Sequence, residues 1–521
     1  MTSRSHRSRS LRALMGAGAL LTSVGLIAAC GGGSDDKGSS EGASPDESTQ
    51  LECPYDALKD IKTPVEIQLW HTQTGLPMKA LDSIAKAYNE SQDKVVVHTE
   101  NQGTLDEQLK KFQDSMAQPK SLPEIIAPDD TVTRFMADSG YVIPATSCIK
   151  ADPEAKAIYD DMVPFIKTAY TIDDTLWPGA FSAANAVLFY NQSHFEKAGL
   201  DINTAPKTLA EVRKVAETLK AANIPGVDKP MVLKVNPWIV EYFISGAGEH
   251  IVNEDNGRKG LATKSLYDNP ASLETFTWIR DMYNDGLLKL TDYTQDVEPF
   301  IAMAFQTSSM LIDTSSAIST VDAAIAGTLT AEDVGLKEGD IDLSSVSLPD
   351  LRIGVGEMPG LKEAGKGQAG GTAWYLIDDE DPTKVAAAWD FMKYFNQPDV
   401  QAKWAIEGSS FPIRKESLKN KDLNEKWTTT RVGKWMATAY KGFETLDPEN
   451  PGPVIGPYKE FRQSSAPRPR RNRVRQPRPG RCGQADRHRT SRRTRFIQEG
   501  SRRLMSSAPA SHEPVAFEES R

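Results

Sequence analysis

Strand-like and helix-like patterns alternate along the first part of the chain. Residues 65–70 alternate apolar and polar side chains, and this period of two predicts a half-buried strand. Residues 78–89 carry apolar side chains at helical spacing and predict a helix. The patterns then predict a strand at 94–98, a helix at 104–116 and a short buried strand at 124–127. This order implies right-handed crossovers and a largely parallel sheet.

A second series of alternating elements starts near residue 186. Its helix over 209–222 begins with a capping box, because Thr208 precedes it and Glu211 follows three residues later. The patterns predict strands at 186–190, 309–312, 352–355 and 373–377, and helices at 191–200, 237–245, 272–285 and 382–395. The body is therefore expected to be an α/β protein with mostly parallel sheets flanked by helices.

The chain begins with a basic segment, an apolar run and a cysteine. Four arginines precede the apolar residues 13–29, which end in small residues before Cys30. This order is typical of an export signal, and the small residues before Cys30 resemble the lipobox of bacterial lipoproteins, whose cysteine is acylated. The alternatives are a signal peptide with a chance cysteine, or a transmembrane helix, for which the run is short.

The lipobox interpretation defines the first two segments of the chain. Residues 1–29 are predicted to be a lipoprotein signal peptide, and residues 30–60 an acylated cysteine with a flexible tether. The rest of the chain is then expected to work outside the cytoplasm, attached to the cell membrane through lipid only.

Charge is distributed unevenly between the body and the C-terminal end. The net charge is −10, yet residues 464–521 contain 15 arginines, no lysine and five acidic residues, which leaves −20 for the rest. Such acidity argues against nucleic acid as a partner. Residues 464–521 lack periodicity and are predicted to be a disordered Arg- and Pro-rich tail. A frame slip near codon 463 explains the abrupt change, and a natural basic tail is the alternative.

Two of the four cysteines belong to the body of the protein. Cys30 is the predicted lipidation site and Cys482 lies in the tail, which leaves Cys53 and Cys148. An exported protein can oxidise such a pair, and the disulfide would close a loop of roughly 95 residues. Two unpaired buried thiols are the alternative.

Five landmarks stand in order between about residues 63 and 462. They are Leu69–His71, Val187–Asn191 with Phe195–Leu200, Met310–Ser315, Gly370–Trp374, and Phe411–Lys415. Together they resemble the extracellular solute-binding proteins of sugar-type ABC importers, the group of maltose- and glycerol-3-phosphate-binding proteins. The resemblance implies two α/β lobes in a periplasmic-binding-protein-like fold, joined by hinge crossovers, with the ligand between them. Lobe one would comprise 63–172 plus 368–408, and lobe two 180–362 plus 412–463.

Candidate ligand-binding residues come from loops that follow the predicted strands. Hydroxyl groups of a sugar or polyol need donors and acceptors, and the apolar face of a sugar ring needs a flat aromatic side chain. The candidates are Trp70, His71, Gln73, Asp129, Asp130, Ser182, Asn185, Trp238, Glu241, Asp313, Thr314, Ser315, Gly370, Gly371, Thr372 and Ser410.

Several candidates have a structural alternative. Asp129 and Asp130 can accept two hydroxyls or cap a helix, and the resemblance matches Asp130 with a glutamate of the glycerol-3-phosphate binders. His71 can donate to a ligand or hold its own loop. Trp238 stands where the family often has a stacking tryptophan, and core packing is the alternative.

The chain also departs from its relatives at expected contact positions. Ala183 and Ala184 replace consecutive hydroxyl residues of the phosphate-binding relatives, which weakens the case for a phosphate ligand. Leu105 replaces a ligand-contacting tyrosine, and Ser410 stands where relatives carry an aromatic residue. A named substrate is therefore not carried over.

The combined features predict a non-catalytic receptor. It would bind a carbohydrate or polyol, act as a monomer and deliver its ligand to ABC permease subunits, without a cofactor or metal. The alternative is a lipid-anchored hydrolase of carbohydrate or cell-wall material, but neither a G-x-S-x-G nor an H-E-x-x-H motif occurs. A metal receptor is disfavoured because the four histidines of the body lack ligand spacing.

Overall fold

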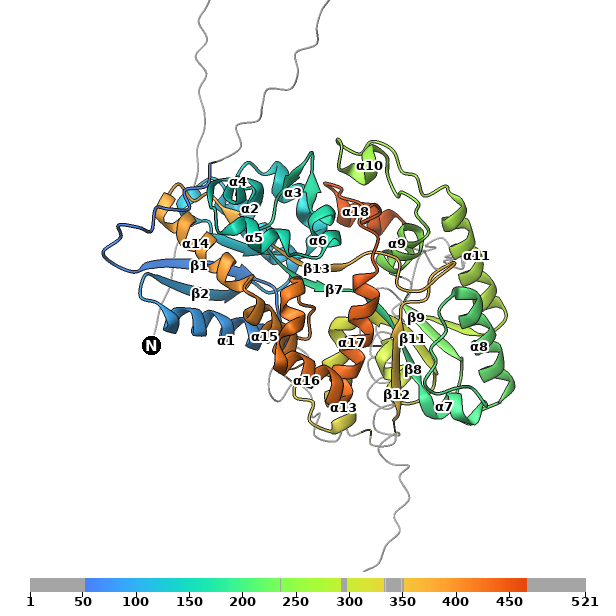
Figure 1. The fold of residues 1–521 in the computed structure, drawn as a ribbon. Coiled ribbons are helices and arrows are strands. Elements are labelled where there is room, and N and C mark those ends of the chain that lie inside the picture. The colour runs from blue at the N-terminus through green and yellow to red at the C-terminus, as the bar shows by residue number, and fades with distance from the viewer. Residues whose placement is uncertain are drawn as a thin grey trace, which may run out of the picture. The chain divides into compact units, whose positions relative to one another are not determined.

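Two β-sheets with helices around them form the body of the protein (Figure 1). The computed structural model describes residues 52–234, 236–291, 298–331, 333, 348 and 351–465. The predicted signal peptide, Cys30 and the tail beyond residue 465 lie outside the described residues.

The first sheet has six strands, and five of them run in one direction. Its order is β2-β1-β3-β13-β4, and β7 pairs with the other end of β13. Because β13 is antiparallel to β3, β4 and β7, it alone opposes the rest. The strands are β1 (Val65–His71), β2 (Val95–Asn101), β3 (Ile125–Ala127), β4 (Val142–Ile143), β7 (Ala180–Ala184) and β13 (Gly370–Ile377).

The second sheet has five strands in the order β10-β9-β11-β8-β12. Four of these strands run in one direction and β8 alone runs in the opposite one, so this sheet is also mostly parallel. Its strands are β8 (Ala186–Asn191), β9 (Met231–Lys234), β10 (Leu288–Thr291), β11 (Met310–Thr314) and β12 (Ile353–Glu357). All six residues of β8 are buried, as expected for a central strand covered on both faces.

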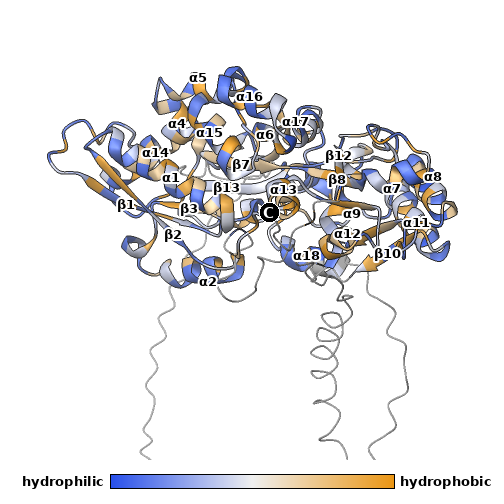
Figure 2. Ribbon diagram, turned by 90° about the horizontal axis from the view of Figure 1, so that it is seen from below, coloured by the Kyte–Doolittle hydropathy of each residue, from blue (hydrophilic) through white to orange (hydrophobic). Residues whose placement is uncertain are grey.

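Helices pack against both sheets with their apolar sides inward, and Figure 2 shows orange and blue residues sharing the same helices. The longer helices are α1 (Gly75–Ser91), α2 (Leu105–Ser115), α8 (Leu209–Ala221), α9 (Pro237–Gly246), α11 (Pro270–Asn284), α14 (Pro382–Phe395), α15 (Pro398–Gly408), α16 (Lys421–Thr429) and α17 (Arg431–Glu444).

Shorter elements complete the described part of the chain. They are α3 (Thr133–Asp138), α4 (Ala145–Ala151), α5 (Ala155–Asp160), α6 (Pro164–Ala169), β5 (Thr171–Ile172), β6 (Thr175–Leu176), α7 (Gln192–Lys197), α10 (Asn253–Gly257), α12 (Glu298–Ala304), α13 (Ile318–Ala326), α18 (Tyr458–Ser465) and the 3-10 turns η1 (Pro119–Ser121), η2 (Asp130–Val132), η3 (Ser315–Ala317) and η5 (Lys415–Lys419).

The chain passes from the first sheet to the second through β7 and β8, which are separated only by Asn185. Beside this crossover, β13 pairs with β7 so closely that a Cβ at Gly371 would lie 1.8 Å from the Ser182 carbonyl oxygen. Only glycine fits this approach, and its φ of +145° also favours glycine.

The predicted fold class is confirmed, and several predicted boundaries differ from those of the elements. The helix expected over 191–200 ends at Lys197, because Gly199 has a positive φ of 72° and the chain turns there. At the other end, α18 runs to Ser465, two residues into the segment predicted to be disordered tail.

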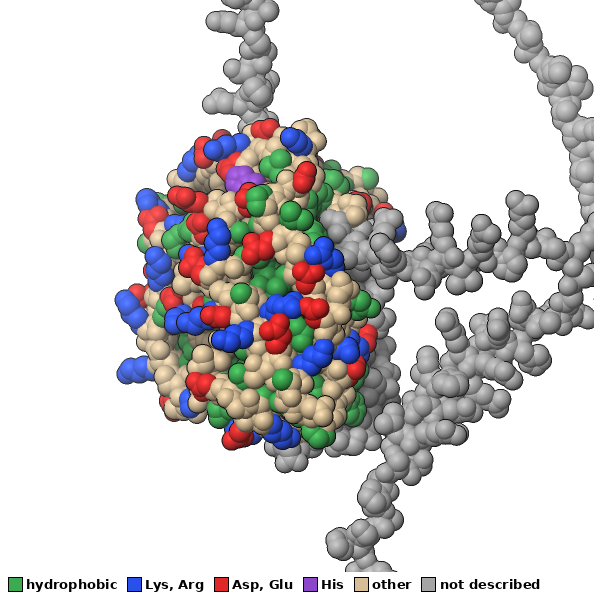
Figure 3. All heavy atoms as spheres, turned by 90° about the vertical axis from the view of Figure 1, so that its right-hand side faces the viewer, with side chains coloured by type: hydrophobic (Ala, Val, Ile, Leu, Met, Phe, Trp, Pro, Cys, Tyr) green, Lys and Arg blue, Asp and Glu red, His purple; other side chains and the backbone are tan. Residues whose placement is uncertain are grey.

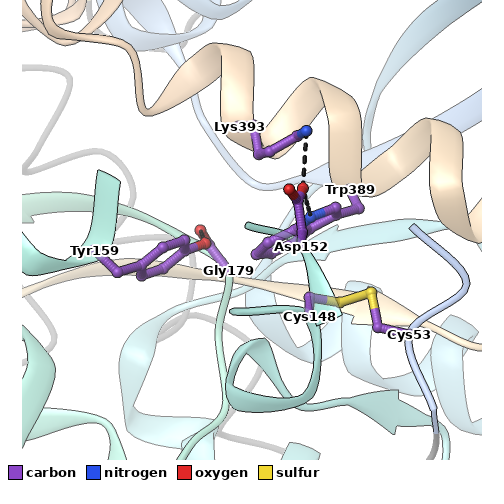
Figure 4. Close-up of a disulfide and its surroundings, with 7 residues drawn as sticks. All are labelled: Cys53, Cys148, Asp152, Tyr159, Gly179, Trp389 and Lys393. Carbon is purple, nitrogen blue, oxygen red and sulfur yellow. Dashed lines mark hydrogen bonds and ion pairs between the residues drawn. A yellow bond between two sulfur atoms is a disulfide. The ribbon is translucent and has the colours of Figure 1, made fainter. Parts of the chain in front are cut away.

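A disulfide joins Cys53 to Cys148, the pair expected from the sequence (Figure 4). Cys148 lies on α4 and is fully buried. Close by, the buried Asp152 accepts a hydrogen bond from Trp389 Nε1 at 3.0 Å and pairs with Lys393 Nζ at 2.8 Å. These contacts attach the segment around Cys148 to helix α14.

One face of the molecule, shown in Figure 3, carries charged side chains of both signs interspersed with polar and apolar ones. Surface ion pairs of the body include that of Arg213 with Glu217 at 2.9 Å, one helical turn apart. Exposed pairs of this kind contribute little to stability. This face is a mixed, solvated surface.

Candidate functional site

A cavity of about 380 Å³ lies where segments leaving both sheets meet. Asp129 and Asp130 reach it directly after β3, Lys234 at the end of β9, and Asp313 at the end of β11. Asn185 lines it from the crossover between the sheets. In α/β proteins, ligands bind outside the carboxyl ends of parallel strands, which is where these side chains stand.

The two adjacent carboxylates have different environments. Asp129 caps the turn η2 and accepts a hydrogen bond from the Thr131 backbone N–H at 3.1 Å. Asp130 accepts one from the Tyr170 hydroxyl at 2.8 Å. Burial, with the nearby charge of Asp129, raises the pKa of Asp130 to about 8. Asp130 is therefore mostly protonated at neutral pH and can donate a hydrogen bond as well as accept one.

Three cationic side chains line the same cavity. Lys234 Nζ lies 4.0 Å from the Asp313 carboxylate. Arg462 of α18 pairs with the fully buried Glu241 at 2.7 Å. Arg258, which follows α10, donates its hydrogen bonds to backbone carbonyls. With Asp129 and Asp130, these groups give the cavity charges of both signs.

Aromatic and amide groups complete the lining. Trp238 stands in the first turn of α9, where the Asn236 side chain caps the helix, and it packs edge-on against Tyr242 at 5.5 Å. Asn185 donates through Nδ2 to the Ala439 carbonyl at 3.1 Å. Its Oδ1 has no hydrogen-bond partner among the described residues, although Asn185 is only 5% exposed. A buried acceptor without a partner is suited to a ligand donor.

Eight of the sixteen candidate residues line the cavity, and they come from distant parts of the sequence. They are Asp129, Asp130, Asn185, Trp238, Asp313, Thr314, Gly370 and Gly371. The structure thus brings together the positions after β3 and β11, the crossover residue and the start of β13.

Four candidates at the end of β1, in the loop after it and on β13 do not line the cavity. Trp70 is buried, and Lys111 Nζ lies 3.8 Å from its ring centroid. His71 accepts from the Gln73 backbone N–H through Nδ1 at 3.1 Å, and burial lowers its pKa. Gln73 Nε2 donates to the Thr372 hydroxyl at 3.2 Å. The last of these bonds joins the β1 loop to β13, and none of the four candidates lines the cavity.

The remaining candidates support the cavity from behind or lie in the crossover. Ser182 and Ser410 hydroxyls lie 3.1 Å apart, and Ser410 donates to the Ala183 carbonyl at 2.9 Å. Ser315 Oγ accepts from the Asn185 backbone N–H at 3.2 Å. Glu241 is fully buried and accepts from the Tyr458 hydroxyl and the Arg462 guanidinium.

Eleven polar or aromatic lining residues were not among the candidates. They are Thr131, Thr133, Tyr170, Lys234, Asn236, Tyr242, Arg258, Ser316, Gln368, Tyr458 and Arg462. The strand-end rule points to Lys234 only if the four-residue strand β9 is recognised. Tyr458 and Arg462 are four apart on a helix, so that spacing alone indicates that they share a face. For Arg258 the sequence holds no such signal.

Comparison of the sequence with known protein families identifies the family of the chain. Residues 83–430 match the model of the bacterial extracellular solute-binding protein family, so the chain belongs to that family. It is 25% identical over 355 residues to the sn-glycerol-3-phosphate-binding periplasmic protein UgpB of Rhizobium meliloti, covering 67% of this chain and 75% of that one. UgpB of Yersinia pseudotuberculosis is likewise 25% identical, over 67% of this chain and 74% of its own.

Solved structures of binding proteins share the fold. The sugar-binding protein MalE of Xanthomonas citri superposes with a TM-score of 0.60 at 15% identity, covering 77% of this chain and 89% of that one. UgpB of Mycobacterium tuberculosis in complex with glycerophosphocholine gives 0.56 at 13% identity, over 74% and 87%. In the described ranges, no helix is both long and apolar enough to cross a bilayer.

Proposed function

We propose that this solute-binding protein is a non-catalytic receptor that holds a carbohydrate or polyol in the cavity between the two sheets and delivers it to an ABC permease. The observation that carries the proposal is the cavity itself. Its volume of about 380 Å³ lies in the range of small-molecule sites, and its lining comes from the ends of strands in both sheets.

The chemistry of the lining suits a ligand rich in hydroxyl groups. Carboxylates accept hydroxyl protons, the protonated Asp130 and the cations donate to ligand oxygens, and Trp238 offers a flat apolar surface. Three carboxylates and three cations line the cavity, so their formal charges balance before Asp130 is protonated. A ligand without a large net charge fits this balance.

The relatives point to the same class of ligand. Those named above bind sn-glycerol-3-phosphate, sugar or glycerophosphocholine, and the GacH receptor of Streptomyces glaucescens was solved with acarbose. Each of these ligands carries at least two hydroxyl groups. We extend that common chemistry, and no single ligand, to this chain.

The N-terminal segment supplies the location in this proposal. Acylation at Cys30 would anchor the receptor to the outer face of the cell membrane, and the Gly- and Ser-rich residues 31–50 would form a flexible tether. Such a tether raises the effective concentration of the receptor near its permease. Mass spectrometry of the membrane-bound protein tests this point, because an unmodified N-terminus at another residue contradicts it.

The decisive experiment is a thermal-shift screen of the full chain against mono-, di- and oligosaccharides, polyols and glycerophosphodiesters. Binding to the folded state raises the melting temperature by mass action. A parallel assay follows release of product from glycoside substrates. A shift without turnover supports the receptor, whereas steady turnover, or no shift with any compound, contradicts it.

Trp238→Ala tests whether the tryptophan contacts the ligand. If the ring stacks on the sugar, its removal weakens binding by more than about 1 kcal/mol, and intrinsic fluorescence changes on binding in the wild type. Trp427→Ala is the matched control, because Trp427 packs against Tyr440 and does not line the cavity. Equal affinity of Trp238→Ala and wild type removes Trp238 from the site.

A further inference from the structure

A strained turn places Arg258 between the core that contains α8 and α9 and helix α6, which packs in the other core. Ile251 and Val252 are buried in the same core as α8 and α9. Immediately after them, Glu254, Asp255 and Asn256 all have φ near +55°, the left-handed region that L-residues rarely adopt. Such strain persists only where surrounding contacts hold it, and it marks segments with a specific task.

The guanidinium of Arg258 makes three hydrogen bonds to backbone carbonyls outside its own turn. Nε donates to Thr168 O at 3.2 Å and Nη2 to Ala169 O at 2.9 Å, both at the C-terminal end of α6, while Nη1 donates to Gly452 O. Helix α6 packs in the other core, through Phe165 and Ile166. The side chain therefore joins the two cores directly at the wall of the cavity.

Backbone hydrogen bonds on both sides reinforce this contact. The Asp173 N–H donates to the Arg258 carbonyl at 2.9 Å, and the Val454 N–H donates to the Asn256 carbonyl at 2.8 Å. Asn256 also fixes the turn itself, since its Oδ1 accepts from the Ile251 N–H at 2.7 Å. Figure 1 shows helices α6, α18 and α10 near one another.

Backbone carbonyl dipoles, together with the nearby charge of Asp255, compensate the charge on Arg258. No ion pair of Arg258 with a carboxylate is found within the part of the chain that the structure describes, and burial lowers its pKa to about 10. The last carbonyls of a helix lack intrahelical partners, so they are suitable acceptors for a guanidinium fork. Lysine, with a single ammonium, cannot reproduce this planar arrangement.

We propose that Arg258 is a positioning residue that acts as a latch and keeps the cavity closed. Its guanidinium holds the end of α6 and the segment at Gly452 against the core that contains α8 and α9. Opening of the cavity requires these hydrogen bonds to be replaced by hydrogen bonds to water. The proposal rests on the proposed function at one point, which is that the receptor binds its ligand in the closed state of the cavity. The latch itself is a property of the free protein.

Hydrogen–deuterium exchange of the full chain without added ligand tests the latch. In Arg258→Met, exchange in peptides spanning 168–176 and 450–456 should accelerate at least tenfold, because the Asp173 and Val454 amides lose protection. Cavity segments 129–133 and 313–317 should follow, since they become exposed when the cavity opens. Arg258→Lys should give an intermediate acceleration. Arg280→Met, at an exposed arginine of α11, is the matched control and should leave exchange unchanged.

Two results overturn the proposal. One is exchange in 168–176 and 450–456 that matches the wild type in Arg258→Met. The other is acceleration that extends equally into α8 and α11, because this would mean that Arg258 only maintains the fold of its own core. Since no ligand is used, failure of the latch is distinguishable from failure of the receptor function, which the thermal-shift screen decides separately.

Discussion

At the scale of single residues, Asp130 shows how the site can hold two adjacent acids. Both carboxylates stand after β3, but only Asp129 is held by the N–H groups of its own turn. Asp130 faces Tyr170 and the cavity instead, and the charge of Arg462 only partly offsets its burial. Protonating one acid removes the repulsion between them, so the pair becomes one acceptor and one donor.

The raised pKa of Asp130 predicts a pH-dependent stability. The folded state holds a proton up to about pH 8, whereas the unfolded chain releases it near pH 3.8. The folded state thus binds more protons between these limits, and this residue's contribution to stability falls as the pH rises from about 4 to 8. Asp130→Asn should therefore gain stability over the wild type, by about 1 kcal/mol or more at pH 8.

Chemical denaturation of both proteins at pH 5 and pH 8 measures this difference. Asn keeps an acceptor for the Tyr170 hydroxyl, so the comparison isolates the charge. Asp138→Asn is the control, because Asp138 lies on the surface and pairs with Arg134. A difference between Asp130→Asn and wild type that does not grow from pH 5 to pH 8 shows that Asp130 is ionised in the folded protein.

At the scale of elements, helix α18 is fixed from both sides of the cavity. Arg462 and Tyr458 contact the buried Glu241 on α9, and Lys459 pairs with Asp106 on α2. The first contact is buried on the Glu241 side, whereas both partners of the second are largely exposed. Burial makes the pair expensive to break, so Glu241 should hold the helix.

Glu241→Gln should destabilise the protein by roughly 3 kcal/mol, because Arg462 would then lack its buried carboxylate. Ligand affinity should fall as well, since Arg462 and Tyr458 line the cavity. Lys459→Met, which removes the exposed pair on the same helix, should cost less than about 1 kcal/mol. Denaturation of the two variants compares these costs, and equal losses would mean that the buried pair does not anchor α18.

The long periodic elements were predictable from the sequence, and so was the short strand β3, but other short elements were not. The capping box of Thr208 and Glu211 is formed, and α8 ends at Ala221, one residue before the predicted end. Helix α14 matches its predicted range of 382–395. Strand β9 has only four residues, so its apolar run gives no distinct period. Whether such a short segment forms a strand depends on how the helices pack around it, and a local sequence pattern does not reveal this packing.

The same limit applies to the candidate site. Strand-end reasoning leads to Asp130 and Asp313, because each directly follows or ends a recognisable strand. It also leads to His71, which ends a strand equally well but is buried by its own loop. Arg258 and Arg462 reach the cavity from a strained turn and a terminal helix far apart in the sequence. Only the three-dimensional arrangement of the two sheets brings them together.

At the scale of the whole molecule, the disulfide connects the start of the described chain to helix α4. Cys53 precedes β1, and Cys148 lies on α4 beside the buried contact of Asp152 with Trp389 (Figure 4). The bond therefore attaches the segment that leads into β1 to helix α4.

Removal of this disulfide should destabilise the protein without altering the cavity. The bond spans 95 residues, and closure of so long a loop in the unfolded chain corresponds to about 4–5 kcal/mol in the chain-entropy model. We expect Cys53→Ala with Cys148→Ala to lower the free energy of unfolding by about 2–5 kcal/mol while ligand affinity changes less than twofold, because neither cysteine lines the cavity. Adding a reductant should reproduce this loss in the wild type and have no further effect on the double variant. If the reduced wild type keeps its full stability, the bond contributes nothing to the fold.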